Sequence, residues 1–167
     1  AENLARDYQI TREEVDRYAE RSFARAVASR EAGYFDDEVV AVTSETFEAD
    51  GFNPREIRLP RKVERVAEDS HVRPSPYEAL AKIRPAFGGV QTGGNSSAVV
   101  DGAAGAIVGR KPSSGKALAR IVAAASVGVP PHIMGIGPVP AIRAVLEQAG
   151  LTLDDIDRFE INEAFGA

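Results

Sequence analysis

The chain has 167 residues, of which 20 are basic and 25 acidic, giving a formal net charge of −5 at pH 7. Apolar residues make up 44% and charged residues 27%, a balance typical of a globular domain and not of a disordered chain. No apolar run reaches 18 residues, which argues against a membrane-spanning helix. The mild acidity argues against nucleic acid as the main partner.

The chain contains no cysteine and only two histidines. This excludes a disulfide framework, a thiolate zinc site and catalysis by a cysteine of this chain. A histidine-rich metal cluster is not expected either, so we predict no bound metal. The lack of cysteine fits a reducing compartment, and residues 1–4 lack the pattern of a signal peptide. We therefore expect a cytoplasmic protein without an export segment.

Residues 1–35 carry the pattern of two helices, the first of them short. Thr11, followed three residues later by Glu14, is the signature of a capping box at the start of the second helix. Gly33 is its predicted end. Apolar and small residues recur between them at three- and four-residue spacing and predict one buried stripe. The stripe consists of Val15, Tyr18, Ala19, Ser22, Phe23, Ala26 and Val27.

Residues 36–76 have the texture of a surface excursion. A short strand is predicted at 39–42, and two edge strands are predicted around a turn at 60–62. Seven acids and six bases lie within 44–73, together with prolines, so this stretch does not form a deep core by itself. A short helix is predicted at 76–83.

From Phe87 onward the chain is rich in small and apolar residues. The near-continuous apolar run 117–127 predicts a strand buried on both faces. A helix is predicted from Pro138 to Gly150, with proline at its first position and glycine at its end. A second strand is predicted through 159–161. Strand, helix and strand indicate an α/β layered core, and a final strand with no helix after it leads us to expect a piece of a longer fold.

Three motifs favour no specific ligand. Residues 109–116 resemble a phosphate-binding P-loop, but the glycine spacing is one residue too long and Ala117 stands where Ser or Thr would reach magnesium. Residues 135–140 begin like a dinucleotide-binding fingerprint but lack its third glycine. The basic string within 55–65 is interrupted by acids, which favours a solvated hairpin over a phosphate site.

Two polar segments are stronger candidates for function. Residues 93–97 combine two glycines with asparagine and serine before an alanine-rich run, so their backbone amides are able to face a ligand at a helix start. A tight turn that caps its own helix is an equally good interpretation. Asn162 and Glu163 follow a predicted strand, and ligands gather beyond the carboxyl ends of strands in α/β sheets.

Taken together, four motifs resemble the thiolase family, which includes acetyl-CoA acetyltransferases and 3-ketoacyl-CoA thiolases. The resemblance extends over essentially the whole chain, with further similarity at residues 1–5, 11–14 and 80–87. The family usually has glycine at the position of Ala98 and alanine at the position of Gly166. The four motifs, in order, are Gly94–Ser97, Asp101–Ala104, Met134–Ala141 and Asn162–Phe165.

The resemblance implies an incomplete, thiolase-like layered α/β fold. In that family two similar α/β halves stack into five layers, and a loop domain inserted in the first half covers the coenzyme A site. Residues 1–86 resemble the loop domain, 87–113 the end of the first half and 114–167 the start of the second half. The family also implies a homo-oligomer.

The resemblance further implies an acyl-CoA acyltransferase that catalyses reversible Claisen condensation or thiolysis of 3-ketoacyl-CoA through an acyl-cysteine. Its substrate is coenzyme A or acyl-CoA, and no covalently bound cofactor is implied. The two family cysteines and the histidine of the Gly-His-Pro motif have no counterpart here, so we expect the 167 residues alone to be inactive. The alternative is a non-catalytic acyl-CoA-binding or assembly subunit.

The family's site residues map onto six positions. Asn162 matches the catalytic asparagine that holds a water in an oxyanion hole, an electrostatic role that an amide is able to fill. Ser97 matches the serine that contacts pantetheine, and Arg73 lies near an arginine that meets the nucleotide end of coenzyme A. Polarizable and aromatic side chains are implied to line the pantetheine and acyl pocket. These are Phe87, Met134 and Phe165.

Overall fold

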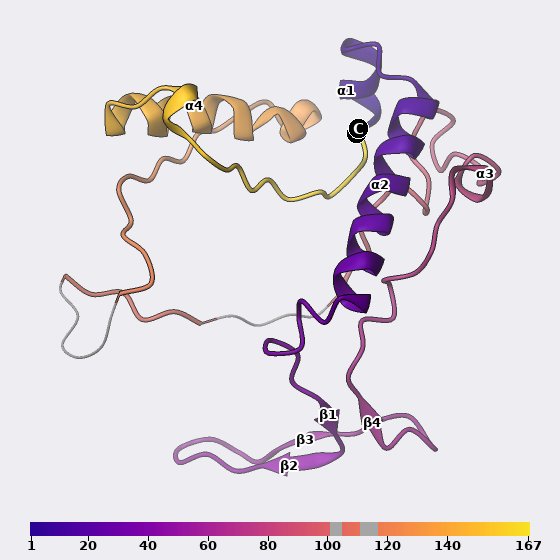
Figure 1. The fold of residues 1–167 in the computed structure, drawn as a ribbon, viewed down its shortest axis with the longest axis vertical. Coiled ribbons are helices and arrows are strands. Elements are labelled where there is room, and N and C mark those ends of the chain that lie inside the picture. Colours follow the sequence, from indigo (N-terminus) through magenta and orange to yellow (C-terminus); the bar gives the residue numbers. More distant parts are fainter. Residues whose placement is uncertain (101–104, 111–116) are drawn as a thin grey trace.

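The computed structural model describes residues 1–100, 105–110 and 117–167 of the chain. The motif at 101–104 and most of the P-loop-like segment at 109–116 lie outside the described residues. A long helix, α2, has the short strands near one end and the C-terminus beside the other (Figure 1). In chain order the elements are α1 (Glu2–Asp7), α2 (Arg12–Glu31), β1 (Val42–Thr43), β2 (Glu45–Phe47), β3 (Arg55–Ile57), β4 (Arg65–Val66), α3 (Tyr77–Leu80), the 3-10 helix η1 (Pro131–Ile136), α4 (Pro138–Ala149) and the 3-10 helix η2 (Leu153–Asp155).

The predicted caps of α2 are confirmed. The Thr11 hydroxyl accepts from the Glu14 N–H at 3.2 Å, and the Glu14 carboxylate accepts from the Thr11 N–H at 2.7 Å. The Thr11 N–H and the Thr11 hydroxyl, which donates to the same carboxylate at 2.8 Å, lower the pKa of Glu14. At the other end, Gly33 adopts φ +68°, a left-handed conformation that ends the helix. Glycine adopts it without the steric strain that a Cβ atom causes. Local chemistry therefore determines both ends of this helix.

The predicted stripe of α2 is buried mainly in its first half. Val15 and Ala19 are buried, and so is Asp16, whereas the other members of the stripe are half-buried. Leu4 and Ala5 of α1 and Leu80 of α3 complete the buried apolar set among the described residues. The core of the described chain is thus small and lies where α1, α2 and α3 meet.

The excursion at 36–76 forms two small antiparallel sheets, and two details differ from the prediction. The strand expected at 39–42 is reduced to its last residue in β1. The strands β3 and β4 flank the turn at 60–62 as predicted, but they do not pair with each other: β3 pairs with β2, and β4 pairs with β1. Pro60 lacks an N–H and interrupts the ladder after β3, so the chain pairs again only beyond the turn.

The two buried strands predicted in the second half of the chain are wrong for this structure. Residues 117–127 and 159–161 have no strand structure, and their large apolar side chains are exposed, Leu118 and Ile121 among them. A strand needs a neighbouring strand to satisfy its backbone N–H and C=O groups, and none of the described residues supplies one. The apolar composition was recognised correctly, whereas the pairing it requires is not formed.

The helices flanking these segments follow the prediction more closely. The helix α4 begins at Pro138 and is followed by Gly150 with φ +67°. The helix α3 occupies the middle of the predicted range 76–83. None of the helices in residues 1–100, 105–110 and 117–167 is both long enough and apolar enough to cross a bilayer.

Candidate functional site

The turn formed by residues 92–97 satisfies its own polar groups. The Thr92 hydroxyl accepts from the N–H groups of Gly94 and Asn95 at 3.1 and 3.2 Å, and the Asn95 side-chain oxygen accepts from the Thr92 N–H at 2.7 Å. The turn is therefore self-satisfied, as one of the two interpretations expected. No helix follows it at 98–100 or 105–110, so the helix start that both interpretations assumed is not found in the described residues.

A buried ion pair on α2 is hydrogen-bonded to this turn. Asp16 is fully buried and accepts from the Asn95 amide at 2.8 Å through one oxygen and from the Arg12 guanidinium at 2.7 Å through the other. Arg12 also donates to the carbonyls of Leu80 and Ile83, both at 2.9 Å. Buried charges are tolerated only when they are paired and hydrogen-bonded, as they are here. The arrangement ties α2 to both α3 and the 92–97 turn.

Sequence analysis missed Asp16. An acidic residue beside Val15, four positions after Arg12, was the available signal, because residues at this spacing are neighbours on a helix. Its importance depends on Asn95, which lies 79 positions away in the sequence. No local pattern reveals that contact.

The 92–97 turn is clipped to the segment 162–166 near the C-terminus. The Ser97 N–H donates to the Ala164 carbonyl at 2.8 Å, and the Gly166 N–H donates to the Asn95 carbonyl at 2.9 Å. These bonds form one antiparallel bridge between Ser96 and Phe165. The clip brings together two predicted substrate-contacting residues, Ser97 and Phe165.

Gly166 allows this segment to lie directly on α2. A Cβ atom at Gly166 would lie 2.8 Å from the Val15 carbonyl oxygen, a distance too short for a real contact. Glycine at this position therefore has a physical reason: the backbone approaches the helix too closely for a side chain.

Glu163 fastens the same segment to α2 a second time. The hydroxyls of Tyr18 and Ser22 donate to its two carboxylate oxygens, each at 2.6 Å. The bond from Ser22, followed by that from Tyr18, lowers the pKa of Glu163, and the nearby charges of Arg21 and Arg25 act in the same direction. Conversely, the bond to Glu163 raises the pKa of Tyr18. The carboxylate is therefore held in its ionised form.

Acidification is expected to release Glu163 from α2. Because folding lowers its pKa, this contact contributes stability above the pKa of the unfolded chain and loses it as the pH falls through the folded pKa. A carbon-13 NMR titration of the Glu163 carboxyl, assigned with Glu163→Gln, measures the shift. Tyr18→Phe should raise that pKa towards its ordinary value. A Glu163 pKa that Tyr18→Phe leaves unchanged would contradict this prediction.

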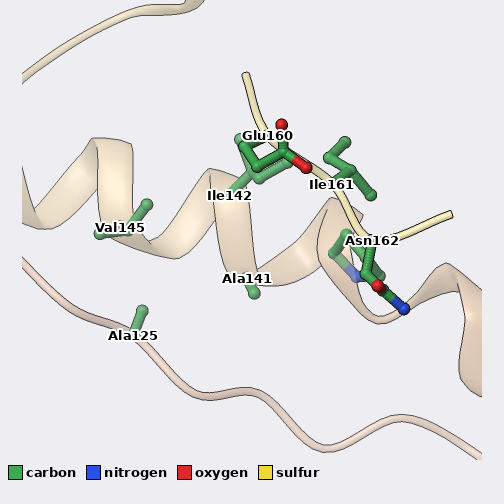
Figure 2. Close-up of a pocket in the computed structure, with 8 residues that line it drawn as sticks. Ala125, Ala141, Ile142, Val145, Glu160, Ile161 and Asn162 are labelled. Carbon is green, nitrogen blue, oxygen red and sulfur yellow. The ribbon is translucent and has the colours of Figure 1, made fainter. Parts of the chain in front are cut away.

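Asn162 lies one residue before this anchor, beside the first turn of α4 (Figure 2). It lines an open and largely apolar hollow of about 300 Å³. The other lining residues are Ala125, Pro138, Ala141, Ile142, Val145, Glu160 and Ile161. The Asn162 side chain itself is exposed, which suits a group that acts on a molecule outside the chain.

The remaining predicted site residues lie on segments that are attached to α1 or α2. Phe87 and Met134 are about three-quarters exposed, at 75% and 74%. The Glu2 carboxylate accepts from the N–H groups of Val90 and Gln91, and the Asn3 amide donates to the His132 carbonyl, so both attachments are made by α1.

Arg73 lies in the irregular segment before α3 and packs against the middle of α2. Its guanidinium carbon is 5.3 Å from the centre of the Phe23 ring in the middle of α2, and it donates to the His71 carbonyl at 3.3 Å. The structure thus gathers Ser97, Phe165 and the segment of Asn162 at one place and leaves Arg73 against a different part of α2. Among the described residues, no group of three His, Asp or Glu side chains is placed to hold a metal ion.

Comparison with known proteins extends over the whole chain. A family model described as "Thiolase, N-terminal domain" matches residues 1–111, and one described as "Thiolase, C-terminal domain" matches residues 115–167. The chain is 43% identical to the peroxisomal 3-ketoacyl-CoA thiolase B of Rattus norvegicus and 43% identical to the acetyl-CoA acetyltransferase of Syntrophomonas wolfei. These matches cover 100% of this chain but 39% and 40% of the two relatives.

A solved structure gives the same result in three dimensions. The human mitochondrial 3-ketoacyl-CoA thiolase in complex with CoA aligns with a TM-score of 0.72 at 34% identity, over 99% of this chain and 39% of that one. The fold is therefore part of a thiolase-like α/β fold, as the sequence predicted. Because family models together span nearly every residue, this chain belongs to the thiolase family.

Proposed function

We propose that this chain is a segment of an acyl-CoA acyltransferase that catalyses the reversible Claisen condensation or thiolysis of 3-ketoacyl-CoA. One observation carries the proposal. Two backbone hydrogen bonds clip the Ser97 turn, which lies in the N-terminal family match, to the 162–166 segment, which lies in the C-terminal match. The clip brings together Ser97 and Phe165, two of the residues that the resemblance assigns to the substrate, next to the segment of Asn162.

Each residue at the clip has a side chain suited to its proposed role. The exposed Asn162 amide would orient a water against the negative charge that develops on an enolate or tetrahedral oxygen. Ser97 would contact the pantetheine arm of coenzyme A, and Phe165, 41% exposed, would lie against its apolar parts. The acyl group would be carried by a cysteine that is not among these 167 residues.

Residues outside the clip complete the proposed substrate site. Phe87 and Met134, both largely exposed, would line the pantetheine and acyl pocket, and Arg73 would meet the nucleotide end of coenzyme A. We assign 1–86 to the domain that covers coenzyme A, 87–113 to the end of the first half and 114–167 to the start of the second. A homo-oligomer in the cytoplasm completes the proposal, although relatives include peroxisomal and mitochondrial thiolases.

A non-catalytic acyl-CoA-binding or assembly subunit is the less favoured alternative. The relatives that match over the full length of this chain have names that describe enzymes, namely thiolases and acetyl-CoA acetyltransferases.

Thiolysis of acetoacetyl-CoA tests the proposed function. The full-length protein that carries this segment is expected to consume acetoacetyl-CoA in a coenzyme A-dependent manner. The loss of absorbance of the magnesium enolate of acetoacetyl-CoA measures this consumption. The 167-residue polypeptide, verified by intact mass, is expected to be inactive because it supplies no nucleophilic thiolate. An inactive full-length protein that still binds acyl-CoA would support the alternative. Activity of the 167-residue polypeptide would contradict the expectation that its acyl carrier lies on a cysteine outside these residues.

A further inference from the structure

We propose that Glu163 is a positioning residue that fixes the orientation of the neighbouring Asn162 amide. The inference rests on the proposed function of Asn162 and adds a residue to it. Glu163 would not touch the substrate. Its carboxylate would act through the backbone by holding the segment on which Asn162 is presented.

The contact geometry supports a rigid attachment. Both carboxylate oxygens are engaged, one by Tyr18 and the other by Ser22, at 2.6 Å each. Hydrogen bonds from hydroxyls to an ionised carboxylate are short and strong, and these distances lie within that class. Tyr18 and Ser22 are four residues apart on α2 and therefore share a face of the helix. Rotation of the carboxylate in either direction would break one of the two bonds.

The position of the attachment in the chain explains why Asn162 depends on it. Residues 159–163 have no helix or strand to hold them. In the part of the chain that the structure describes, the Asn162 side chain has no hydrogen-bond partner. The backbone clip begins only at Ala164, so Glu163 is the fastening closest to the amide. The helix α2 thereby fixes both proposed substrate segments: Asp16 holds the Ser97 turn and Tyr18 with Ser22 holds the segment of Asn162.

The charges around Glu163 favour this attachment. Arg21 and Arg25 of α2 lie close enough to stabilise the carboxylate, and the hydroxyl donors come from the same helix. At neutral pH the group is therefore ionised and accepts both bonds. Glutamine in its place keeps the shape but loses the charge and replaces one carboxylate oxygen by an NH₂ donor. One of the two hydroxyls therefore loses its acceptor and must reverse or give up its hydrogen bond.

The experiment uses the full-length protein and acetoacetyl-CoA thiolysis. Glu163→Gln is expected to lower kcat by about 10- to 100-fold, the size of effect that a small misplacement of a catalytic group produces, with KM for coenzyme A changed less than about threefold. Tyr18→Phe and Ser22→Ala should each cause a smaller loss of kcat. The matched control is Glu147→Gln on the exposed face of α4, which removes the same charge and should leave kcat unchanged.

A double variant separates positioning from a general structural role. In the Asn162→Ala background, Glu163→Gln is expected to lower kcat by less than about twofold, because residues that act through one another are not additive. Multiplicative losses, or a Glu163→Gln protein with the kcat of the control, would overturn the inference. If Glu163→Gln fails to fold, the Tyr18→Phe/Ser22→Ala double variant removes the same contacts and is judged by the same two criteria.

A spectroscopic measurement keeps this inference separate from the proposed function. If the full-length wild type lacks thiolysis activity, the proposed function fails, and the positioning role is decided by NMR of the Asn162 side-chain amide. Glu163→Gln should increase the mobility of that amide relative to wild type and to Glu147→Gln. An unchanged Asn162 amide in an inactive protein would overturn both proposals, whereas an unchanged amide in an active protein would overturn the positioning role alone.

Discussion

Alanine in place of Asn162 is expected to lower kcat of the full-length protein by about 10²- to 10³-fold, the loss that follows removal of one oxyanion-hole donor. In the proposed role, the exposed amide acts on charge that exists only in the transition state, so KM should change little. Steady-state kinetics of acetoacetyl-CoA thiolysis measures both constants.

Two further variants sharpen this prediction. Asn162→Asp keeps the shape but places negative charge where negative charge develops, so its loss should be at least as large as that of alanine. Gln148→Ala removes an amide from the exposed face of α4 and serves as the control. A kcat for Asn162→Ala within about threefold of wild type would remove Asn162 from the oxyanion hole, a role whose loss costs far more.

The second large effect is expected at the buried ion pair. Asp16→Ala removes one acceptor from the Arg12 guanidinium and one from the Asn95 amide, which keeps only its bond to the Val90 carbonyl. We expect a loss of about 3 kcal/mol in the free energy of unfolding, at the lower end for a broken buried pair because the Arg12 side chain is 24% exposed. KM for coenzyme A should rise as well, since the Ser97 turn loses its support. Urea-induced unfolding and steady-state kinetics of the full-length protein measure these effects.

The pair formed by Arg6 and Asp7 is the matched control. Its charged atoms are 3.0 Å apart, but its side chains are 70% and 44% exposed. Asp7→Ala should therefore change the free energy of unfolding by less than about 1 kcal/mol, as is usual for surface ion pairs. If Asp7→Ala and Asp16→Ala lowered the free energy of unfolding equally, burial would not be the reason why the Asp16 hydrogen bonds stabilise the protein.

Helix boundaries could be predicted because their causes are local. The capping box of Thr11 and Glu14 and the ends of α4 at Pro138 and Gly150 depend on residues a few positions apart. The strand predicted for the apolar run at 117–127 is not formed, because its formation depends on residues that are distant in the sequence. Its composition is local, but a strand requires a partner from elsewhere in the fold.

The candidate site divides in the same way. The motifs around Ser97 and Asn162 could be found in the sequence because each is a short run of suitable side chains. The contact between Ser97 and the segment of Phe165 could not be found in this way. The hydrogen bonds that form it join a residue of the N-terminal family match to residues of the C-terminal match. The roles of Asp16 and Glu163 could not be predicted either, because the sequence does not show which residues donate hydrogen bonds to a given carboxylate.

The sequence by itself determined the ends of α2 and α4, the absence of a cysteine nucleophile in these 167 residues and the resemblance to the thiolase family. Each of these follows from neighbouring residues or from composition. Only the tertiary structure decided that α2 carries both polar segments, Asn95 on Asp16 and Glu163 on Tyr18 and Ser22. These contacts join residues 79 to 145 positions apart, and the chain brings such distant groups within hydrogen-bonding distance only by folding.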